Sequence, residues 1–386
     1  MKLLLSLLLT VSITVFGTVV VAGTTASQIT SNSYEDTLPQ IKGNYLVWQG
    51  YVGGDWEIFL YNTVTDEITQ ITNNDYNDLS PQTDGTCIVW HGSNDGEWDI
   101  FLWDGGDIHL ISDRGADDLS PQVANGLIVW TSEPFGDDFV APSEIILYRT
   151  QNQTHTVLSA HVDPGNTLED SAPRINDEVV VWIQGRDQDA TTQYMYDLSN
   201  GTITQNPDYV WRESAERDGN LSLLTRHDGH DTELFLYNAA SRRYHQITYN
   251  SLQDKYPSRS ENLIAWMAGG EIFLAKLNYL GLTSPRDGAV LFESQPPTFT
   301  WEALGYDTFK LQFSKNPGFP KKETLTLPRK KRGRLSEKSF APTTQEWALI
   351  IAAKRTDGYV YWRVAGKNSA RDKGFSETWT FCIQND

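Results

Sequence analysis

Short apolar segments separated by turn residues form the dominant pattern of the chain. Residues 46–48 are apolar, residues 58–61 form a second such segment, and residues 68–72 are rich in Ile and Thr. Gly, Asn and Asp lie between these segments. Short apolar and β-branched segments bounded by such turn formers are typical of strands and not of amphipathic helices. The pattern therefore predicts an all-β protein.

The same pattern repeats along most of the sequence. In each copy an Asp is followed three residues later by a Pro, and a Trp lies nine residues after the Pro. The clear copies are Asp36/Pro39/Trp48, Asp78/Pro81/Trp90, Asp118/Pro121/Trp130, Asp170/Pro173/Trp182 and Asp254/Pro257/Trp266. Successive prolines are 42, 40, 52 and 84 residues apart, so the last gap has room for one more copy. Arg212, Ala215 and Leu224 occupy its three positions, which gives six copies in total.

Each copy has room for about four strands in roughly 40–45 residues, as a propeller blade has. The motif Asp-x-x-Pro, then Ile-Val-Trp, then Asp-Ile-Phe-Leu-Trp, then Ile-Thr-Gln-Ile-Thr resembles that of TolB-type six-bladed β-propellers. The resemblance covers roughly residues 25–279. It implies a propeller domain over residues 23–279 and a role in binding or scaffolding at the cell envelope, since that family includes periplasmic and exported proteins.

The sixth copy lacks an outer strand of its own after residues 271–276. A matching segment lies at the other end of the propeller, because Gln28-Ile29-Thr30 precedes Gln70-Ile71-Thr72 by 42 residues. We therefore expect residues 25–30 to supply the outer strand of the last blade. This strand would close the ring and remove an open sheet edge.

Residues 280–386 have a different pattern, of alternating strands with Trp301, Trp362 and Trp379. Such strands over about 100 residues predict a two-sheet β-sandwich. The segment resembles a fibronectin type III or related Ig-like module, which implies that it binds, spaces or orients.

The first residues are expected to form an export signal. Met1-Lys2 is followed by an apolar stretch up to Val21 and then by Ala22-Gly23. We expect cleavage after Ala22, which makes residues 1–22 a signal peptide, with Ala26 as the second choice. An uncleaved membrane anchor is the alternative, because the apolar stretch is nearly long enough to span a bilayer. The sequence thus predicts a periplasmic or secreted protein.

Charge is distributed unevenly between the two predicted domains. Residues 280–386 carry 17 Lys and Arg against 11 Asp and Glu, a charge of +6. The rest of the chain carries 14 against 39, a charge of −25, which together gives −19. An acidic propeller argues against a nucleic-acid partner.

The repeated Asp is the first candidate for function. The acidic column, as we call Asp36, Asp78, Asp118, Asp170 and Asp254, is expected to lie at the mouth of the propeller channel. A ring of carboxylates there could hold a cation such as calcium or attract a basic ligand. The alternative is that each Asp accepts hydrogen bonds from its own turn.

Two insertions make the third copy the longest clear one. Strand order in a four-stranded antiparallel blade places both on the same face as the acidic column, and function is often found on such elaborated loops. The candidate ligand-binding residues are Glu133, Phe135, Asp137, Asp138, His161 and Asp163, together with Arg212 of the degenerate copy.

Two further clusters have chemical potential. The segment His227-Asp-Gly-His230-Asp231 could ligate a metal, but it aligns with a hairpin turn of the second copy, so we expect a turn and assign no metal ligand. A basic loop could bind an anionic polymer or remain a solvated loop. Its residues are Arg329, Lys330, Lys331, Arg332 and Arg334.

No hydrolase elbow, zinc-protease, Walker or Rossmann motif is present, and no cofactor is expected. The sequence therefore favours a non-enzymatic binding or scaffold protein that recognises a protein or polysaccharide through one propeller face. Two alternatives stay open. One is a glycan-cleaving hydrolase or lyase that uses carboxylates at the channel mouth, and the other is a surface protein held by its basic loop.

Overall fold

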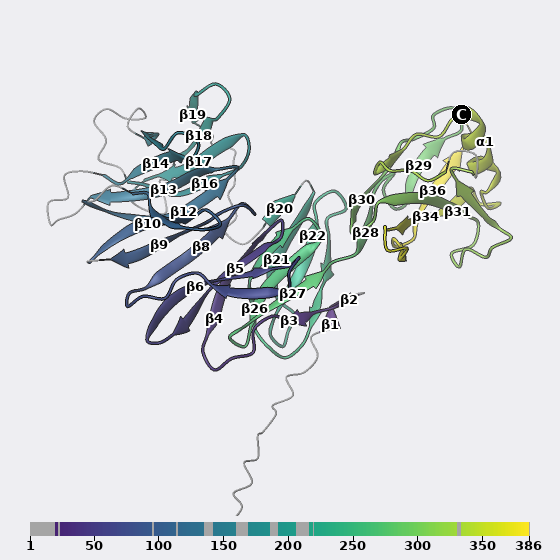
Figure 1. Ribbon diagram of the computed structural model, residues 1–386. Helices are drawn as coiled ribbons and strands as arrows, with labels where there is room; N and C mark the ends of the chain where they lie inside the picture. The colour runs from purple at the N-terminus through teal and green to yellow at the C-terminus, as the bar shows by residue number, and fades with distance from the viewer. Residues whose placement is uncertain are drawn as a thin grey trace, which may run out of the picture.

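The computed structural model describes residues 20–21, 24–94, 96–112, 115–134, 142–159, 169–185, 192–205, 216–218, 220–329 and 333–385. Six four-stranded antiparallel sheets come first and are followed by two sheets of a separate C-terminal part (Figure 1). The prediction of an all-β fold with six propeller blades is confirmed. No helix of the described part has the length and hydrophobicity needed to cross a bilayer.

The first three blades follow each other along the chain and each pairs its strands in sequence order. Blade 1 consists of β4 (Asp36–Lys42), β5 (Tyr45–Val52), β6 (Asp55–Asn62) and β7 (Glu67–Gln70). Blade 2 consists of β8 (Asp78–Thr83), β9 (Ile88–Asn94), β10 (Glu97–Trp103) and β11 (Ile108–Leu110). Blade 3 consists of β12 (Ala116–Ala124), β13 (Leu127–Pro134), β14 (Glu144–Arg149) and β15 (Thr154–Val157).

The last three blades include the degenerate copy. Blade 4 consists of β16 (Asp170–Ile175), β17 (Val179–Gln184), β18 (Thr192–Asp197) and β19 (Ile203–Gln205). Blade 5 consists of β20 (Glu216–Asp218), β21 (Leu221–His227), β22 (Thr232–Asn238) and β23 (Arg243–Gln246). Blade 6 consists of β25 (Asp254–Ser260), β26 (Leu263–Ala268), β27 (Glu271–Lys276) and β3 (Ser27–Gln28).

The Asp-x-x-Pro motif forms a bulge in the innermost strand of its blade. In blade 1 the pairing of β4 with β5 steps from Thr37↔Gln49 to Gln40↔Val47, so that Leu38 and Pro39 together face Trp48. Leu38 has a φ of +53°, and the residue before the repeated Pro has a φ of 51–56° in blades 2, 3, 4 and 6 as well. A proline fits at a bulge because no ladder hydrogen bond is required of it there. The repeated Pro therefore marks a bend in the inner strand.

The continuous apolar segments of the second strands arise because both faces of a blade are buried. Side chains alternate between the two faces of a strand. Val47 packs with Ile88 and Trp90 of blade 2, whereas Leu46 and Trp48 pack with residues of blade 6. Contacts of this kind connect blade 4 through blades 3, 2, 1 and 6 to blade 5. The connection from blade 4 to blade 5 includes residues 206–215, which lie outside the described residues.

The N-terminal strand completes blade 6, as the sequence predicts. In β3, Ser27 and Gln28 pair with Leu274 and Phe273 of β27. The Thr30 hydroxyl accepts a hydrogen bond of 2.9 Å from the backbone N–H of Ile272 and donates one of 2.6 Å to Glu271. A small sheet lies beside this strand, formed by β1 (Val20–Val21), β2 (Thr24–Thr25) and β24 (Thr248–Tyr249). The sequence analysis did not predict it, and β1 lies within the segment assigned to the signal peptide.

The C-terminal part contains two sheets that share one core. The smaller sheet consists of β28 (Tyr279–Ser284), β30 (Phe299–Leu304) and β33 (Ser339–Phe340). The larger sheet consists of β29 (Ala289–Phe292), β36 (Trp379–Gln384), β34 (Tyr359–Lys367), β31 (Thr308–Ser314), β32 (Thr324–Leu327) and β35 (Lys373–Phe375). Trp301, Trp362 and Trp379 are buried between the sheets. We call this part the sandwich; its membership of the fibronectin type III or Ig-like group stays a prediction.

The sandwich also contains the helix α1 (Thr344–Ala352), which the sequence analysis missed. Thr343 and Glu346 form a capping box at its N-terminus, and Trp347 on this helix is buried in the core. The segment therefore carries a helix start signal of a Thr followed three residues later by a Glu.

Strand order gives the propeller two distinct faces. The loop face carries the turns between second and third strands and the connections between blades. The opposite face carries the turns between first and second strands and between third and fourth strands. The sandwich follows the end of β27 on the opposite face, where Asn220 and Asn238 donate hydrogen bonds of 2.9 and 3.1 Å to Glu302 and Tyr279. Arg243 lies 3.7 Å from Asp287 in the same contact.

The hydroxyl of Thr30 offers a test of whether the N-terminal strand is an integral part of blade 6. Thr72 has the same role in blade 1, where its hydroxyl accepts from the backbone N–H of Ile58 at 2.8 Å. Both threonines are buried, so Thr30→Val and Thr72→Val are each expected to lower the free energy of unfolding by about 1–3 kcal/mol, because a buried N–H loses its acceptor. Urea unfolding followed by Trp fluorescence measures this.

Thr65→Val is the control for these two variants, since Thr65 lies exposed in the turn after β6. A cost for Thr72→Val without a cost for Thr30→Val would show that the N-terminal strand is not needed for the blade.

Candidate functional site

The acidic column lies inside the blades and is bonded to the repeated Trp. In four blades the indole Nε1–H donates to the Asp carboxylate twelve residues before it. The distances are 2.8 Å for Trp48 to Asp36, 2.8 Å for Trp90 to Asp78, 2.8 Å for Trp130 to Asp118 and 3.0 Å for Trp182 to Asp170. The five Asp side chains are at most 2 % exposed. The column therefore links the first strand to the second in blades 1 to 4.

The other carboxylate oxygen is bonded within the connecting turn. Asn74 donates from its side chain to Asp78 at 2.8 Å and accepts from the backbone N–H of Tyr76 at 3.0 Å. Asn32 does the same in blade 1, with a distance of 2.7 Å to Asp36. The turn and the Trp together account for the hydrogen bonds of both carboxylate oxygens in blades 1 and 2. A ligand role for the column stays a prediction. It requires a ring of free carboxylates, whereas these side chains are buried.

Burial dominates the electrostatics of the column. It raises the pKa of Asp78 to about 6, although the hydrogen bonds from Asn74 and Trp90 act in the opposite direction. Burial raises the pKa of Asp118 to about 6 as well, against the hydrogen bonds from Ser132 and Trp130. These carboxylates therefore ionise with difficulty, as expected when a charged form is removed from water.

Asp254 in blade 6 departs from this arrangement. The indole N–H of Trp266 is buried and has no hydrogen-bond partner in the described structure. Asp254 instead accepts a 2.5 Å hydrogen bond from Thr248 and lies beside Glu233 of blade 5. Burial and the neighbouring Glu233 carboxylate raise the pKa of Asp254 to about 7. Asp254, the last member of the column, thus lies beside the carboxylate of Glu233 on the loop face.

The strand ends that border the longest connections of the propeller lie on the loop face of blades 3 to 5. These connections cover residues 135–143, 158–169, 185–191 and 206–215, whereas the corresponding segments cover residues 53–54 and 71–77 after strands of blade 1 and residues 95–96 and 111–115 after strands of blade 2. Of the predicted ligand-binding residues only Glu133 is described. Phe135, Asp137, Asp138, His161, Asp163 and Arg212 lie outside the described residues.

Glu133 is exposed at the end of β13 on the loop face. It lies opposite Asp117 in the pairing of β12 with β13. Partial burial raises the pKa of Glu133, and the negative charges of Asp117 and Glu169 add to this effect. The described base of the long connections is therefore acidic. The sequence analysis missed Asp117 and Glu169, although each directly precedes a member of the acidic column.

The basic loop divides into two parts. Arg329 is exposed, and Lys330, Lys331 and Arg332 lie outside the described residues. Arg334 is half-buried, and its guanidinium donates to the Thr308 hydroxyl at 2.8 Å and to the carbonyls of Thr308 and Ala365 at 3.0 and 3.1 Å. Burial lowers the pKa of Arg334. Arg334 thus fastens the loop to the larger sheet of the sandwich, and a ligand role for the basic loop stays a prediction.

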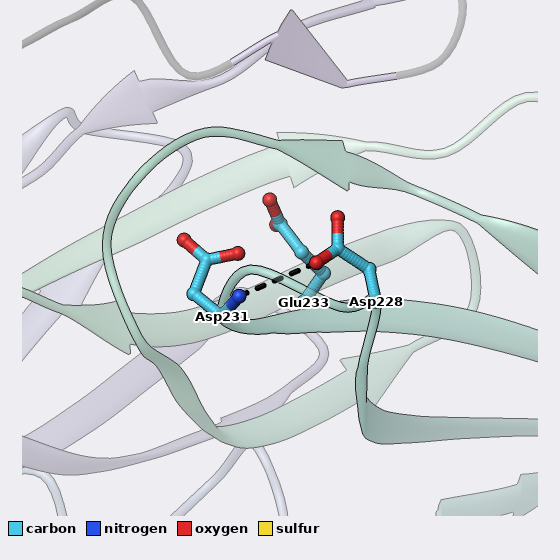
Figure 2. A group of neighbouring side chains, drawn as sticks. All are labelled: Asp228, Asp231 and Glu233. Atoms are coloured by element: carbon cyan, nitrogen blue, oxygen red, sulfur yellow. Dashed lines mark hydrogen bonds between the residues drawn. The ribbon is translucent and has the colours of Figure 1, made fainter.

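The segment from His227 to Asp231 is a hairpin turn, as predicted. The backbone N–H of Asp228 donates to the carbonyl of Asp231 at 3.0 Å, and His227 Nδ1 accepts from the backbone N–H of Gly229. The carboxylates of Asp228, Asp231 and Glu233 converge at this turn (Figure 2), with one oxygen of each within 4.8 Å of the others. The sequence analysis did not include Glu233. Its position two residues after Asp231, on the same side of β22, was the available signal.

No protein-family model matches the sequence, and no curated protein matches it. Solved structures are similar at low identity. An oligogalacturonate lyase from Vibrio parahaemolyticus has a TM-score of 0.46 and 12 % identity, covering 67 % of this chain and 96 % of its own. TolB from Acinetobacter baumannii has a TM-score of 0.36 and 14 % identity, covering 57 % of this chain and 60 % of its own. The propeller domain of the Trilobed protease from Pyrococcus furiosus has a TM-score of 0.41 and 12 % identity, covering 61 % and 92 %.

The raised pKa of Asp78 leads to a pH-dependent effect of Asp78→Asn. Between about pH 4 and pH 6 the folded state keeps this proton while the unfolded chain has lost it, so wild-type stability falls as the pH rises through this window. Asn does not titrate. Between pH 4 and pH 7 the unfolding free energy of the variant should therefore rise relative to that of the wild type by on the order of 2–3 kcal/mol. This amount follows because the pKa of Asp78 is raised by about two units. Urea titrations at both pH values measure it.

Asp104→Asn is the control, because hydrogen bonds from the Asp107 backbone and from His109 lower the pKa of this exposed carboxyl to about 2. Its pH effect falls between about pH 2 and pH 4, so its difference should change little between pH 4 and pH 7. A shift for Asp78→Asn against the variant, or none, would contradict the role of burial.

Proposed function

We propose that this protein is an exported, non-enzymatic binding protein that recognises its partner through the loop face of the propeller. The observation that carries this proposal is the position of the sandwich. It contacts the opposite face through Asn220, Asn238 and Arg243. The described strand ends that border the long connections of blades 3 to 5 lie on the other face, away from these contacts, and loops held by a rigid frame are a usual place for recognition.

The negative charge of the loop face favours a basic or neutral partner over an acidic one. Glu133, Asp117 and Glu169 lie at the base of the long connections, and the chain outside residues 280–386 carries a charge of −25. Complementary charges speed up association and exclude partners of the same sign. A protein surface with basic residues, or a neutral polysaccharide, fits this face better than an acidic polymer does. The sandwich serves as the spacer or second contact.

Glycan cleavage by the acidic column is the weaker alternative. A general acid and base must reach the substrate. The carboxylates of Asp36, Asp78, Asp118 and Asp170 are buried and hydrogen-bonded to Trp side chains. They act in holding the blades together, which favours binding over catalysis.

Site-specific photocrosslinking tests the binding face. A photoreactive amino acid replaces Glu133 on the loop face, and in a matched variant it replaces Val64, which is 71 % exposed on the opposite face. Each variant of residues 23–386 is irradiated with envelope and culture fractions of the source cells, and the adducts are identified by mass spectrometry. We expect one reproducible adduct from position 133 that is absent from position 64.

Adducts only from position 64, or none from position 133, would contradict the proposal. The same purified protein is incubated with a panel of polysaccharides. New reducing ends or unsaturated products, lost on Asp→Asn changes in the acidic column, would establish the glycan-cleaving alternative instead.

A further inference from the structure

The turn between β21 and β22 brings three carboxylates to one point. Asp228 follows β21, Asp231 precedes β22, and Glu233 is the second residue of β22. One oxygen of each lies within 4.8 Å of the other two (Figure 2). Two oxygens that bind one ion from opposite sides at 2.3–2.6 Å are separated by about 4.6–5.2 Å. The spacing therefore matches three ligands around a single ion.

Asp231 provides a second and independent observation. This side chain is only 6 % exposed, and its Oδ1 has no hydrogen-bond donor in the described structure. Glu233 is 1 % exposed, accepts from Asn250 at 2.7 Å and 3.2 Å, and lies beside the carboxyl group of Asp254. A buried carboxylate oxygen without a donor is strongly unfavourable. The three carboxylates therefore lack a positive charge that would balance their negative charges.

The described turns of the other blades do not repeat this group. In blade 1, Asp55 and Glu57 correspond to Asp231 and Glu233, but Val52 stands where blade 5 has Asp228. In blade 2, Glu97 and Asp99 correspond to Asp231 and Glu233, but Asn94 stands where blade 5 has Asp228. The turn from Asp104 to Asp107 has the same Asp-Gly-x-Asp sequence but lies on the opposite face, where Asp107 is exposed and Asp104 is paired with His109 at 2.9 Å. The described turns of blades 1 and 2 therefore lack the third carboxylate of blade 5.

We propose that Asp228, Asp231 and Glu233 bind a calcium ion on the loop face. The donor set consists of carboxylate oxygens alone, which suits a hard cation and not zinc or copper. Carbonyls of the turn and water complete the six to eight oxygen ligands that calcium takes. The hairpin sets no octahedral geometry, and calcium accepts irregular coordination more readily than magnesium does. The bound ion supplies the missing charge beside Asp231 and fixes the turn. This inference does not depend on the proposed function.

Calcium titration of the chelator-treated full chain tests this. Isothermal titration calorimetry should give one site per chain with a dissociation constant on the order of 10⁻⁵–10⁻³ M. Calcium at 100 times that concentration should raise the melting midpoint by about 5 °C, and magnesium should raise it much less. Asp231→Asn should weaken calcium binding at least about tenfold and abolish the melting shift.

Two further variants make the result decisive. Asp228 is exposed, so Asp228→Asn keeps the fold if Asp231→Asn does not, and it should weaken binding in the same way. Asp107→Asn changes a turn with the same Asp-Gly-x-Asp sequence on the opposite face of blade 2, and this variant should bind calcium as the wild type does. No binding at millimolar calcium, or unchanged binding by both Asp228→Asn and Asp231→Asn, would overturn the proposal. Either result leaves the crosslinking test of the loop face unaffected.

Discussion

The hydrogen bond from the repeated Trp to the buried Asp of its own blade is the interaction on which the propeller depends. It connects the start of the inner strand to the second strand beside the bulge formed by the repeated Pro. Its space requirement is visible at Gly50 and Gly92, where an added Cβ would lie 2.6 Å and 2.4 Å from the oxygens of Asp36 and Asp78. The Asp, Pro and Trp that recur in the sequence are therefore parts of one structural unit.

This unit determines where function can lie. The repeated carboxylates are buried in the frame, and the sandwich covers part of the opposite face through Tyr279 and Arg243. The loop face remains, with the strand ends that border the long connections of blades 3 to 5 and the acidic turn at Asp228. The proposed calcium site lies where the Asp–Trp bond is missing, since Glu233 adjoins Asp254, and Trp266 lacks the bond that its counterparts in blades 1 to 4 make.

Sequence periodicity was sufficient to predict the architecture, because five of the six blades carry the same Asp, Pro and Trp at the same buried positions. It also predicted the strand at Ser27–Gln28 and the turn at His227–Asp231. It did not show that in four copies the Asp bonds to the Trp twelve residues later, since a regular spacing does not reveal which side chains point toward each other. The contacts of Arg334 and Glu233 were missed for the same reason. Both residues form side-chain hydrogen bonds with residues distant in sequence, Thr308 and Asn250.

The most direct test of this account is a pair of double-mutant cycles on the unfolding free energy. The first combines Asp118→Ala with Trp130→Phe, which share a 2.8 Å hydrogen bond. The second combines Asp254→Ala with Trp266→Phe, which share none, since the Trp266 indole has no partner in the described structure. We expect a coupling energy of about 1–3 kcal/mol in the first cycle and additivity within about 0.5 kcal/mol in the second. Additive effects of the Asp118 and Trp130 changes would contradict the structural role of the acidic column.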